Sequence, residues 1–164
     1  MGNLLHECVQ FYQEQGLSII PILSRRKEAA IKWLDYQKRH PSKAEIKQWF
    51  SNDTSNIAVV TGAISNNLCV LDCDSEEKYI ELEGIIENKL GIDNLISHTP
   101  VVKTGKGYHV YFRTEELVRC QKFPGLDIKG EGGYVIAPPS IHPNGTEYKF
   151  INQNVPSIMV IHSL

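Results

Sequence analysis

Three short segments of the sequence, residues 68–74, 108–113 and 126–129, each carry their acidic, basic and histidine side chains at positions of one parity. Successive side chains of a β-strand point to opposite faces of a sheet, so this pattern predicts strands with one apolar face and one ionisable face. The groups that share a face within their segment are Asp72 and Asp74, His109 and Arg113, and Asp127 and Lys129. If the three strands are neighbours, one face of the sheet packs on helices and the other is polar.

Capping residues and helical periodicity predict three helices around these strands. The first runs from Asn3, as N-cap, to about residue 15. The second begins at Ser42, which has the capping-box spacing to Glu45, and runs through residues 49–50. The third covers residues 75–90. The apolar side chains that we expect to face inward from it are Tyr79, Leu82, Ile85, Ile86 and Leu90.

Further strands are expected between clusters of turn-forming residues. They lie at residues 17–22, 56–61, 99–103, 133–137 and 147–151. The glycine-rich residues 104–107 separate two of the predicted strands and favour a hairpin there. Residues 24–40, by contrast, are basic and irregular. Two or three helices against mostly antiparallel strands predict an α+β fold.

Length and composition fit one globular domain that covers residues 1–164. With 41% hydrophobic and 22% charged residues, the chain is neither a coiled coil nor wholly disordered. No apolar run could span a membrane, and the first residues lack the pattern of a signal peptide, so we expect a cytoplasmic protein. The net charge is −2, but eight of the acidic residues lie between positions 72 and 93, so the rest of the chain is mildly basic. Nucleic-acid binding is therefore permitted but not required.

A polar face with two or three carboxylates, a histidine and a lysine has a chemical use. Neighbouring carboxylates repel each other unless a cation compensates their charge. Mg²⁺ binds proteins through a few carboxylates together with substrate phosphates, and two such ions can assist phosphoryl transfer. His109 and Lys129 are donors suited to the oxygens of a triphosphate.

Each feature also has a simpler structural interpretation. Asp74 could cap the helix that follows it, Asp127 could pair with Lys129, and a single strand histidine is usually structural. The glycines of residues 104–107 fit a plain hairpin and lack the full pattern of a phosphate-binding Walker loop. The basic residues between positions 25 and 39 would by default form a solvated loop. The agreement of parity in three strands favours a site.

The order of several short motifs resembles the bifunctional primase–polymerase (prim-pol) domain of the archaeo-eukaryotic primase superfamily, which is frequent in plasmid and phage replication proteins. The motifs are Thr61-Gly62 and residues 70–74, 104–112, 126–130 and 132–140. Residues 16–21 and Lys32-Trp33 match the opening of the family pattern, and residues 142–145 with Tyr148 match its close. The resemblance thus covers nearly the whole chain, which could be the N-terminal part of a longer replication protein.

The resemblance implies an RRM-like, mostly antiparallel sheet with helices packed on one face, as in the primase catalytic core. It implies that Asp72, Asp74 and Asp127 bind two ions of Mg²⁺ or Mn²⁺ and are catalytic together with His109. His109 would contact the phosphates of the incoming nucleotide. The further residues of the nucleotide pocket would be Lys129, Lys106, Ser140 and His142.

The function that the resemblance implies is a DNA-dependent nucleotidyltransferase, acting as primase, polymerase or both. Its partners would be nucleoside triphosphates, a single-stranded DNA template with its primer, and in some contexts a helicase domain or protein. Two alternatives stay open. One is a non-catalytic module that binds nucleotides or single strands, for which Tyr111 is the only aromatic side chain on the polar face of its strand. The other is a metal-dependent phosphodiesterase.

Overall fold

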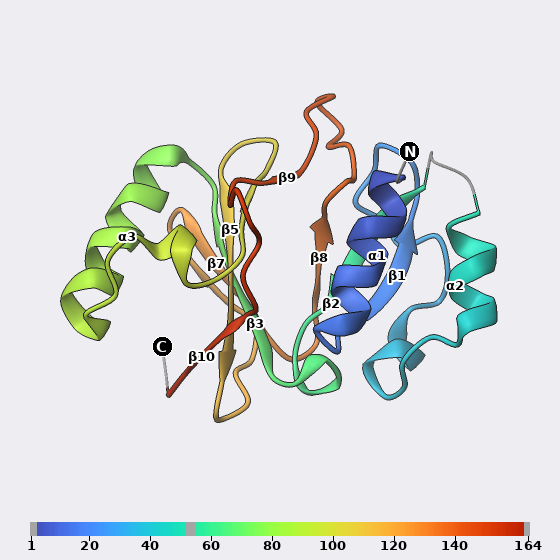
Figure 1. The fold of residues 1–164 in the computed structure, drawn as a ribbon, viewed down its shortest axis with the longest axis horizontal. Helices are drawn as coiled ribbons and strands as arrows, with labels where there is room; N and C mark the ends of the chain where they lie inside the picture. Colours follow the sequence, from blue (N-terminus) through green and yellow to red (C-terminus); the bar gives the residue numbers. More distant parts are fainter. Residues whose placement is uncertain (1–2, 52–54, 163–164) are drawn as a thin grey trace.

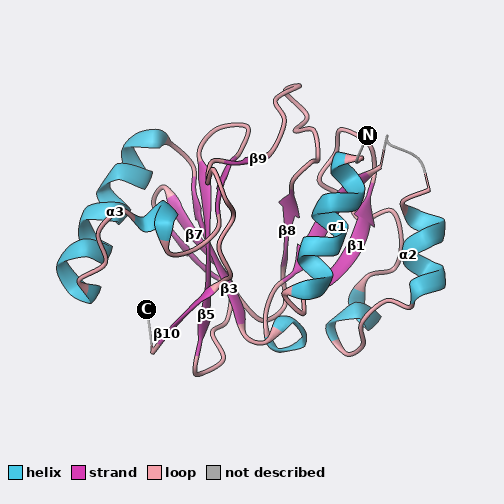
Figure 2. Ribbon diagram, viewed as in Figure 1, coloured by secondary structure: helices cyan, strands magenta, loops and turns pink. Residues whose placement is uncertain are grey.

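Two β-sheets lie opposite each other, with the helices at residues 76–90 and 43–49 on their outer sides and the helix at residues 4–14 in contact with both sheets (Figures 1 and 2). The computed structural model describes residues 3–51 and 55–162, so the first two residues of the segment searched for a signal peptide lie outside it. Within the described residues no helix has the length and apolar character needed to cross a membrane. The α+β class predicted from the sequence is confirmed, and all but one of the strand pairings are antiparallel.

The smaller sheet has the strand order β1-β2-β8. These strands are β1 (Ser18–Ile22), β2 (Asn56–Val60) and β8 (Tyr134–Ala137). Every residue of β1 and β2 is buried, because the sheet is covered on both faces. This explains why the two segments read as continuous apolar runs in the sequence and not as alternating ones.

The larger sheet has the order β6-β7-β3-β5-β4-β9, and β10 pairs with β5 in parallel. Its strands are β3 (Leu68–Cys73), β4 (Val101–Lys103), β5 (Tyr108–Thr114), β6 (Gln121–Phe123), β7 (Leu126–Lys129), β9 (Lys149–Phe150) and β10 (Met159–Ile161). The predicted hairpin joins β4 to β5. β6 and β10 were not anticipated, since neither three-residue strand alternates clearly in the sequence.

The three predicted helices form where their caps indicated: α1 (Leu4–Glu14), α2 (Lys43–Trp49) and α3 (Glu76–Leu90). The side chain of Asn3 accepts a hydrogen bond from the backbone of Leu5, and Ser42 and Glu45 form the reciprocal capping box. Three short 3₁₀ helices, Leu34–Gln37, Ala63–Ser65 and Leu95–Ser97, lie in the connections.

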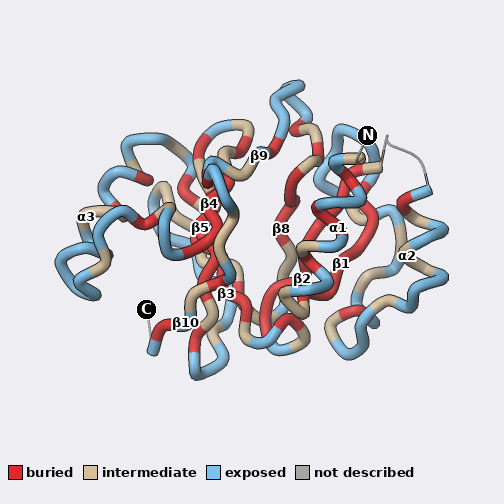
Figure 3. Tube along the Cα trace, in the orientation of Figure 1, coloured by how far each residue is buried: buried red, intermediate tan, exposed pale blue. Residues whose placement is uncertain are grey.

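The alternating faces of the larger sheet pack into two different cores (Figure 3). Leu71 and Phe112 lie on the face that packs against α3, together with its residues Tyr79, Leu82 and Ile86. Ile85 and Leu90, which were predicted to face inward, are 44% and 43% exposed. They line a shallow apolar hollow instead, because α3 diverges from the sheet toward its C-terminal end (Figure 1).

The opposite face is not the open polar surface that the sequence suggested. Val70, Val102 and Tyr111 lie on it and are fully buried, because they pack with the smaller sheet and α1. Helix α1 contacts both sheets, and its Phe11 ring lies 5.6 Å from that of Phe150 in β9. Polar side chains remain on this face around Asp72 and, toward the other end of β5, at Arg113, whose guanidinium donates to the backbone carbonyl of Gln15.

The chain crosses between the sheets at both ends of the face that they share. Residues 61–67 connect β2 to β3, and residues 130–133 connect β7 back to β8. These two crossings are hydrogen-bonded to each other, since the Thr61 hydroxyl donates to the carbonyl oxygen of Gly130. The third crossing, residues 138–148, leads from β8 to β9 and is held by Ser140, whose hydroxyl bonds the backbone of Ile57.

We predict that Gly107→Ala destabilises the fold, because a Cβ there would lie 1.9 Å from the carbonyl oxygen of Cys73. Relieving such an overlap with backbone costs about 1–3 kcal/mol, to be measured by urea unfolding. Gly84→Ala is the matched control, since a Cβ at that position in α3 meets no atom within 4 Å. It should raise the free energy of unfolding by up to roughly 1 kcal/mol. Equal stability of the two variants would contradict the packing described.

Candidate active site

The pairing of three strands places Asp72, His109 and Asp127 side by side on one face of the larger sheet. In the register of β3 with β5, Asp72 lies opposite His109, and in the register of β3 with β7 it lies opposite Asp127. Residues directly opposite on neighbouring strands have Cβ atoms about 4.5–5.5 Å apart. The imidazole Nε2 of His109 lies 3.3 Å from Oδ1 of Asp72. The parity argument therefore identified this row correctly.

Asp72 is held in its ionised form. Burial acts to raise the pKa of its carboxyl. A hydrogen bond from His109 and the charge of that imidazole act in the opposite direction, as do the charges of Lys129 and Lys27. The net effect is a pKa below the ordinary value for aspartate. The Asp72 carboxylate therefore carries a negative charge at neutral pH.

His109 is buried, and only one of its ring nitrogens has a protein partner. Among the described residues the buried Nδ1 atom makes no hydrogen bond. Buried polar atoms nearly always have a partner, so an atom without one is unusual. His109 lines the pocket, and its contact with substrate stays a prediction.

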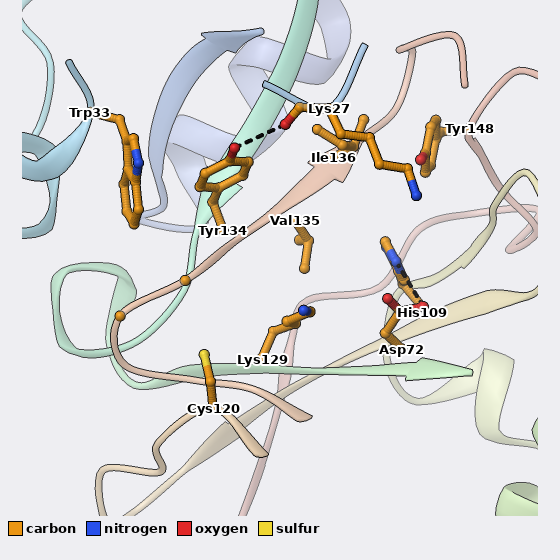
Figure 4. A pocket seen from close by; sticks show the side chains of 12 residues that line it. Lys27, Trp33, Asp72, His109, Cys120, Lys129, Tyr134, Val135, Ile136 and Tyr148 are labelled. Carbon is orange, nitrogen blue, oxygen red and sulfur yellow. Dashed lines mark hydrogen bonds and ion pairs between the residues drawn. The ribbon is translucent and has the colours of Figure 1, made fainter. Parts of the chain in front are cut away.

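Two lysines contribute positive charge from opposite sides of the site (Figure 4). Lys129 of β7 forms an ion pair with Asp127, with 3.5 Å between Nζ and Oδ2. Lys27 belongs to the basic segment that the sequence presented as a solvated loop. A tight turn holds this segment, since the backbone of Leu23 bonds that of Glu28. Lys27 is exposed and borders the pocket, and sequence reasoning missed it because nothing in a basic run indicates which cation lies beside a pocket.

A pocket of about 400 Å³ lies between the two sheets. Its lining from the larger sheet includes Asp72, His109 and Lys129. The smaller sheet and the connections supply Lys27, Trp33, Cys120, Gly132, Gly133, Tyr134, Val135, Ile136 and Tyr148 (Figure 4). Of these nine, all but Lys27 and Cys120 fell within motifs of the family pattern without receiving a role. The volume suits a small molecule of nucleotide size.

Asp74 lies apart from this pocket in the structure. Asp74 follows the last residue of β3. Its carboxylate lies beside Gly125, with Oδ1 3.3 Å from the position that a Cβ on this glycine would occupy, and the side chain of Lys78 in α3 lies beside the same position. Within residues 3–51 and 55–162, no three His, Cys, Asp or Glu side chains lie close enough together to hold a metal ion. Its role as a metal ligand stays a prediction.

The donor set that the structure does bring together nevertheless fits a divalent ion. Asp72 and Asp127 lie opposite each other, and neighbouring carboxylates favour a cation between them. Mg²⁺ commonly uses only one or two protein carboxylates and completes its coordination with waters and substrate phosphates. Asp72, in the pocket lining, and Asp127, opposite it outside the lining, are two carboxylates of this kind, and together with His109 they do not form a three-residue metal cluster in the described structure.

Ser140, His142 and Lys106 were also predicted to belong to the nucleotide pocket, but they are not among the described residues that line it. The hydroxyl of Ser140 is buried and both donates to and accepts from the backbone of Ile57, so it has a structural task. The ring of His142 packs against Gly105, and its Nδ1 accepts a hydrogen bond from Asn144. Burial, with the charges of Lys27 and Lys106, lowers the pKa of His142. Lys106 itself is exposed in the β4–β5 turn.

Tyr148 connects the two regions. Its ring centroid lies 6.2 Å from that of His109 and 5.9 Å from that of His142. The phenol therefore lies between the imidazole that lines the pocket and the one that does not.

Comparison with known families finds one match over most of the chain. The model of a family described as bifunctional DNA primase/polymerase, N-terminal, matches residues 9–160. The matched segment contains every residue of the pocket and both carboxylates of the proposed donor set. A comparison with curated proteins finds no match.

The lowered pKa of Asp72 predicts a pH dependence of stability. A carboxyl whose pKa is lower in the folded state contributes stability above its unfolded pKa of about 3.9 and loses that contribution as the pH falls through the folded value. The difference in free energy of unfolding between the wild type and Asp72→Asn should therefore shrink between roughly pH 6 and pH 2. Urea unfolding at several pH values measures it. A difference that stays constant or widens contradicts the electrostatics described.

Proposed function

The chain belongs to the bifunctional DNA primase/polymerase family, and we propose that it adds nucleotides to a 3′-hydroxyl on a single-stranded DNA template, as primase, polymerase or both. At the level of the family this is a nucleotidyltransferase of the DNA primase/polymerase type. Its setting would be the replication of a plasmid, phage or other mobile element.

The observation that carries the proposal is the row formed by Asp72, His109 and Asp127 in three paired strands. Asp72, which is ionised, and His109 line a pocket of nucleotide size, and Asp127 lies opposite Asp72 outside that lining. This combination suits a substrate that carries several phosphates, because carboxylates approach phosphate only where cations compensate the charge.

Asp72 and Asp127 would hold the divalent ions, Mg²⁺ or Mn²⁺, that polymerases of this type use. Such ions supply acidification of the primer hydroxyl and neutralisation of the charge on the departing pyrophosphate. The hydrogen bond from His109 fixes the orientation of the Asp72 carboxylate, which leaves its other oxygen for a ligand. Asp74, beside Lys78, is the remaining predicted ligand, and its substitution tests separately whether it belongs to the set.

The triphosphate would lie among His109, Lys129 and Lys27. His109 lines the pocket, and the two lysines offer ammonium groups from opposite walls (Figure 4). Hydrogen bonds to charged groups are stronger than neutral ones, and a partly enclosed pocket strengthens them further. These residues would therefore orient the phosphate chain toward the carboxylates.

The exposed basic residues of the segment between β1 and α2 would contact the template backbone. The exposed ones are Arg25, Arg26, Lys27, Lys32, Lys38 and Arg39, of which Lys27 also lines the pocket. Contacts of this kind are electrostatic and carry no sequence information. They would account for binding to single-stranded DNA despite the net negative charge of the chain.

The larger sheet does not favour a passive nucleic-acid reader. Readers of that type stack bases on exposed aromatic side chains of the sheet surface. Tyr111, the aromatic residue on this face of β5, is fully buried beneath the smaller sheet. The face that remains accessible carries Asp72 and Asp127, which repel phosphate unless a cation is present.

Replacement of either carboxylate should abolish nucleotide addition. We expect Asp72→Ala and Asp127→Ala to extend a labelled primer at least 100-fold more slowly than the wild type, with cooperative unfolding retained, because transition-state charge would lose its compensation. Asp74→Ala should have the same effect if that residue completes the set. Asp93→Ala is the control, since Asp93 is exposed in the loop after α3.

Chelation by EDTA should stop the reaction, and added Mg²⁺ or Mn²⁺ should restore it. Wild-type rates in Asp72→Ala would overturn the assignment of the carboxylates. Labelled DNA that becomes shorter, with no lengthening in the presence of nucleotides, would identify a phosphodiesterase instead.

Lys27 provides a separate prediction about nucleotide binding. Lys27→Met should raise the KM for nucleotides by roughly 10- to 100-fold, the range expected on losing a hydrogen bond to a charged group. Lys38→Met, an exposed lysine of the same basic segment, is the matched control and should change it less than about 3-fold. Steady-state extension assays measure both. Equal effects of the two variants would mean that Lys27 acts only through the general charge of the segment.

A further inference from the structure

The pocket between the sheets has two chemically different ends (Figure 4). At one end, the charged end, lie Asp72, His109 and the ammonium group of Lys27. At the other, the aromatic end, lie Trp33 and Tyr134. Val135 and Lys129 lie between the two ends (Figure 4). A ligand that fills the pocket must match this polarity, with an anionic part at one end and a flat apolar part at the other.

The two rings of the aromatic end are fixed by their contacts. The ring centroids of Trp33 and Tyr134 are 4.9 Å apart, at an interplanar angle of 80°. The hydroxyl of Tyr134 donates a hydrogen bond of 2.9 Å to the backbone carbonyl of Lys27. Both residues are only half-buried, so the rings keep accessible surface in the pocket. An edge-to-face pair covers one face of one ring, which leaves other ring faces open to a flat group.

The wall beside these rings consists of bare backbone. Gly132 and Gly133 line the pocket immediately before Tyr134. Gly132 has φ +93°, a conformation that glycine adopts without strain, and a Cβ at this position would meet no atom within 4 Å. The space in front of Gly132 is therefore open. A planar ligand can approach the backbone there without meeting a side chain.

We infer that the aromatic end binds the nucleobase of the incoming nucleotide by its face, against Trp33 with Tyr134 beside it, while the triphosphate lies at the charged end. The inference rests on the proposed function, because it places the same nucleotide in the same pocket. It adds the direction in which the nucleotide lies and two residues that hold it.

Recognition through the face of the base suits template-directed synthesis. The edge of an incoming base must stay free to pair with the template, so the protein cannot use it for hydrogen bonds. Every base has a π-face, so stacking tolerates all four, and it strengthens binding by roughly 5- to 150-fold per base. Trp33 and Tyr134 would thus raise the affinity for nucleotides without selecting among them.

The fluorescence of Trp33 gives a direct test in the full chain. The sequence contains two tryptophans, and Trp49→Phe leaves Trp33 as the sole emitter. Titration of this variant with each of the four nucleotides and Mg²⁺ should quench its emission in a saturable way. Inorganic tripolyphosphate should compete with the nucleotides but produce little quenching of its own. Equal responses to tripolyphosphate and nucleotides, or none to either, would overturn the inference.

Substitution of Trp33 provides a second, kinetic test. Trp33→Ala should raise the KM for all four nucleotides about 10-fold or more, leave kcat within about 3-fold, and leave inhibition by tripolyphosphate unchanged. Trp33→Phe, which keeps an aromatic face, should restore most of the affinity. An unchanged KM, or weaker binding of single-stranded DNA with normal nucleotide affinity, would contradict the assignment; the second result would assign the ring to a template base.

The two proposals fail in different ways. A wild-type chain that does not extend primers refutes the proposed function, whereas the titration needs no turnover and still reports on the aromatic end. A wild-type chain that extends primers, combined with a Trp33→Ala variant of normal KM, refutes only the present inference. If Trp33→Ala unfolds, the titration of Trp49→Phe still decides.

Discussion

The antiparallel pairing of β3 with its two neighbours is the constraint on which the site depends. It places Asp72 between His109 and Asp127, which lie 37 and 55 positions after Asp72 in the chain and 18 positions from each other. If the register of either pairing shifted by one residue, the side chains of the shifted strand would exchange faces. His109 or Asp127 would then point into the apolar core against α3. Packing of Leu71 and Phe112 in that core therefore fixes the register of the polar row on the other face.

The charges of the site are arranged to tolerate two carboxylates before any cation arrives. His109 lies within 3.3 Å of Asp72, and Lys129 within 3.5 Å of Asp127, so each acidic group has a basic neighbour. Lys27 adds to this from the opposite wall and contributes to lowering the pKa of Asp72. The same lysines and imidazole are the groups that a polyphosphate requires, which explains how one small region suits both cations and phosphates.

The local parts of this structure could be predicted from the sequence, and the non-local parts could not. Parity placed Asp72, His109 and Asp127 on one face, and capping residues such as Ser42 located the helices, because both signals lie within a few residues. The burial of Tyr111 depends on the smaller sheet, and nothing in the sequence around Tyr111 itself indicates that this sheet covers it. One available signal was overlooked: strands β1 and β2 are apolar on both faces, which requires cover on both sides. Asp74, beyond the last residue of β3, escaped the parity rule because the strand ends before it.

The three crossings of the chain between the sheets bound the shared face at both ends, and hydrogen bonds from Thr61 and Ser140 to backbone carbonyls fasten them. The separation of the walls is thus determined when the protein folds, by contacts that involve no ligand. A ligand then binds in a cavity whose width is already set, so the protein loses little conformational entropy on binding. The fixed separation of the walls limits the thickness of a ligand that can enter, so the cavity selects ligands by shape before any polar contact forms.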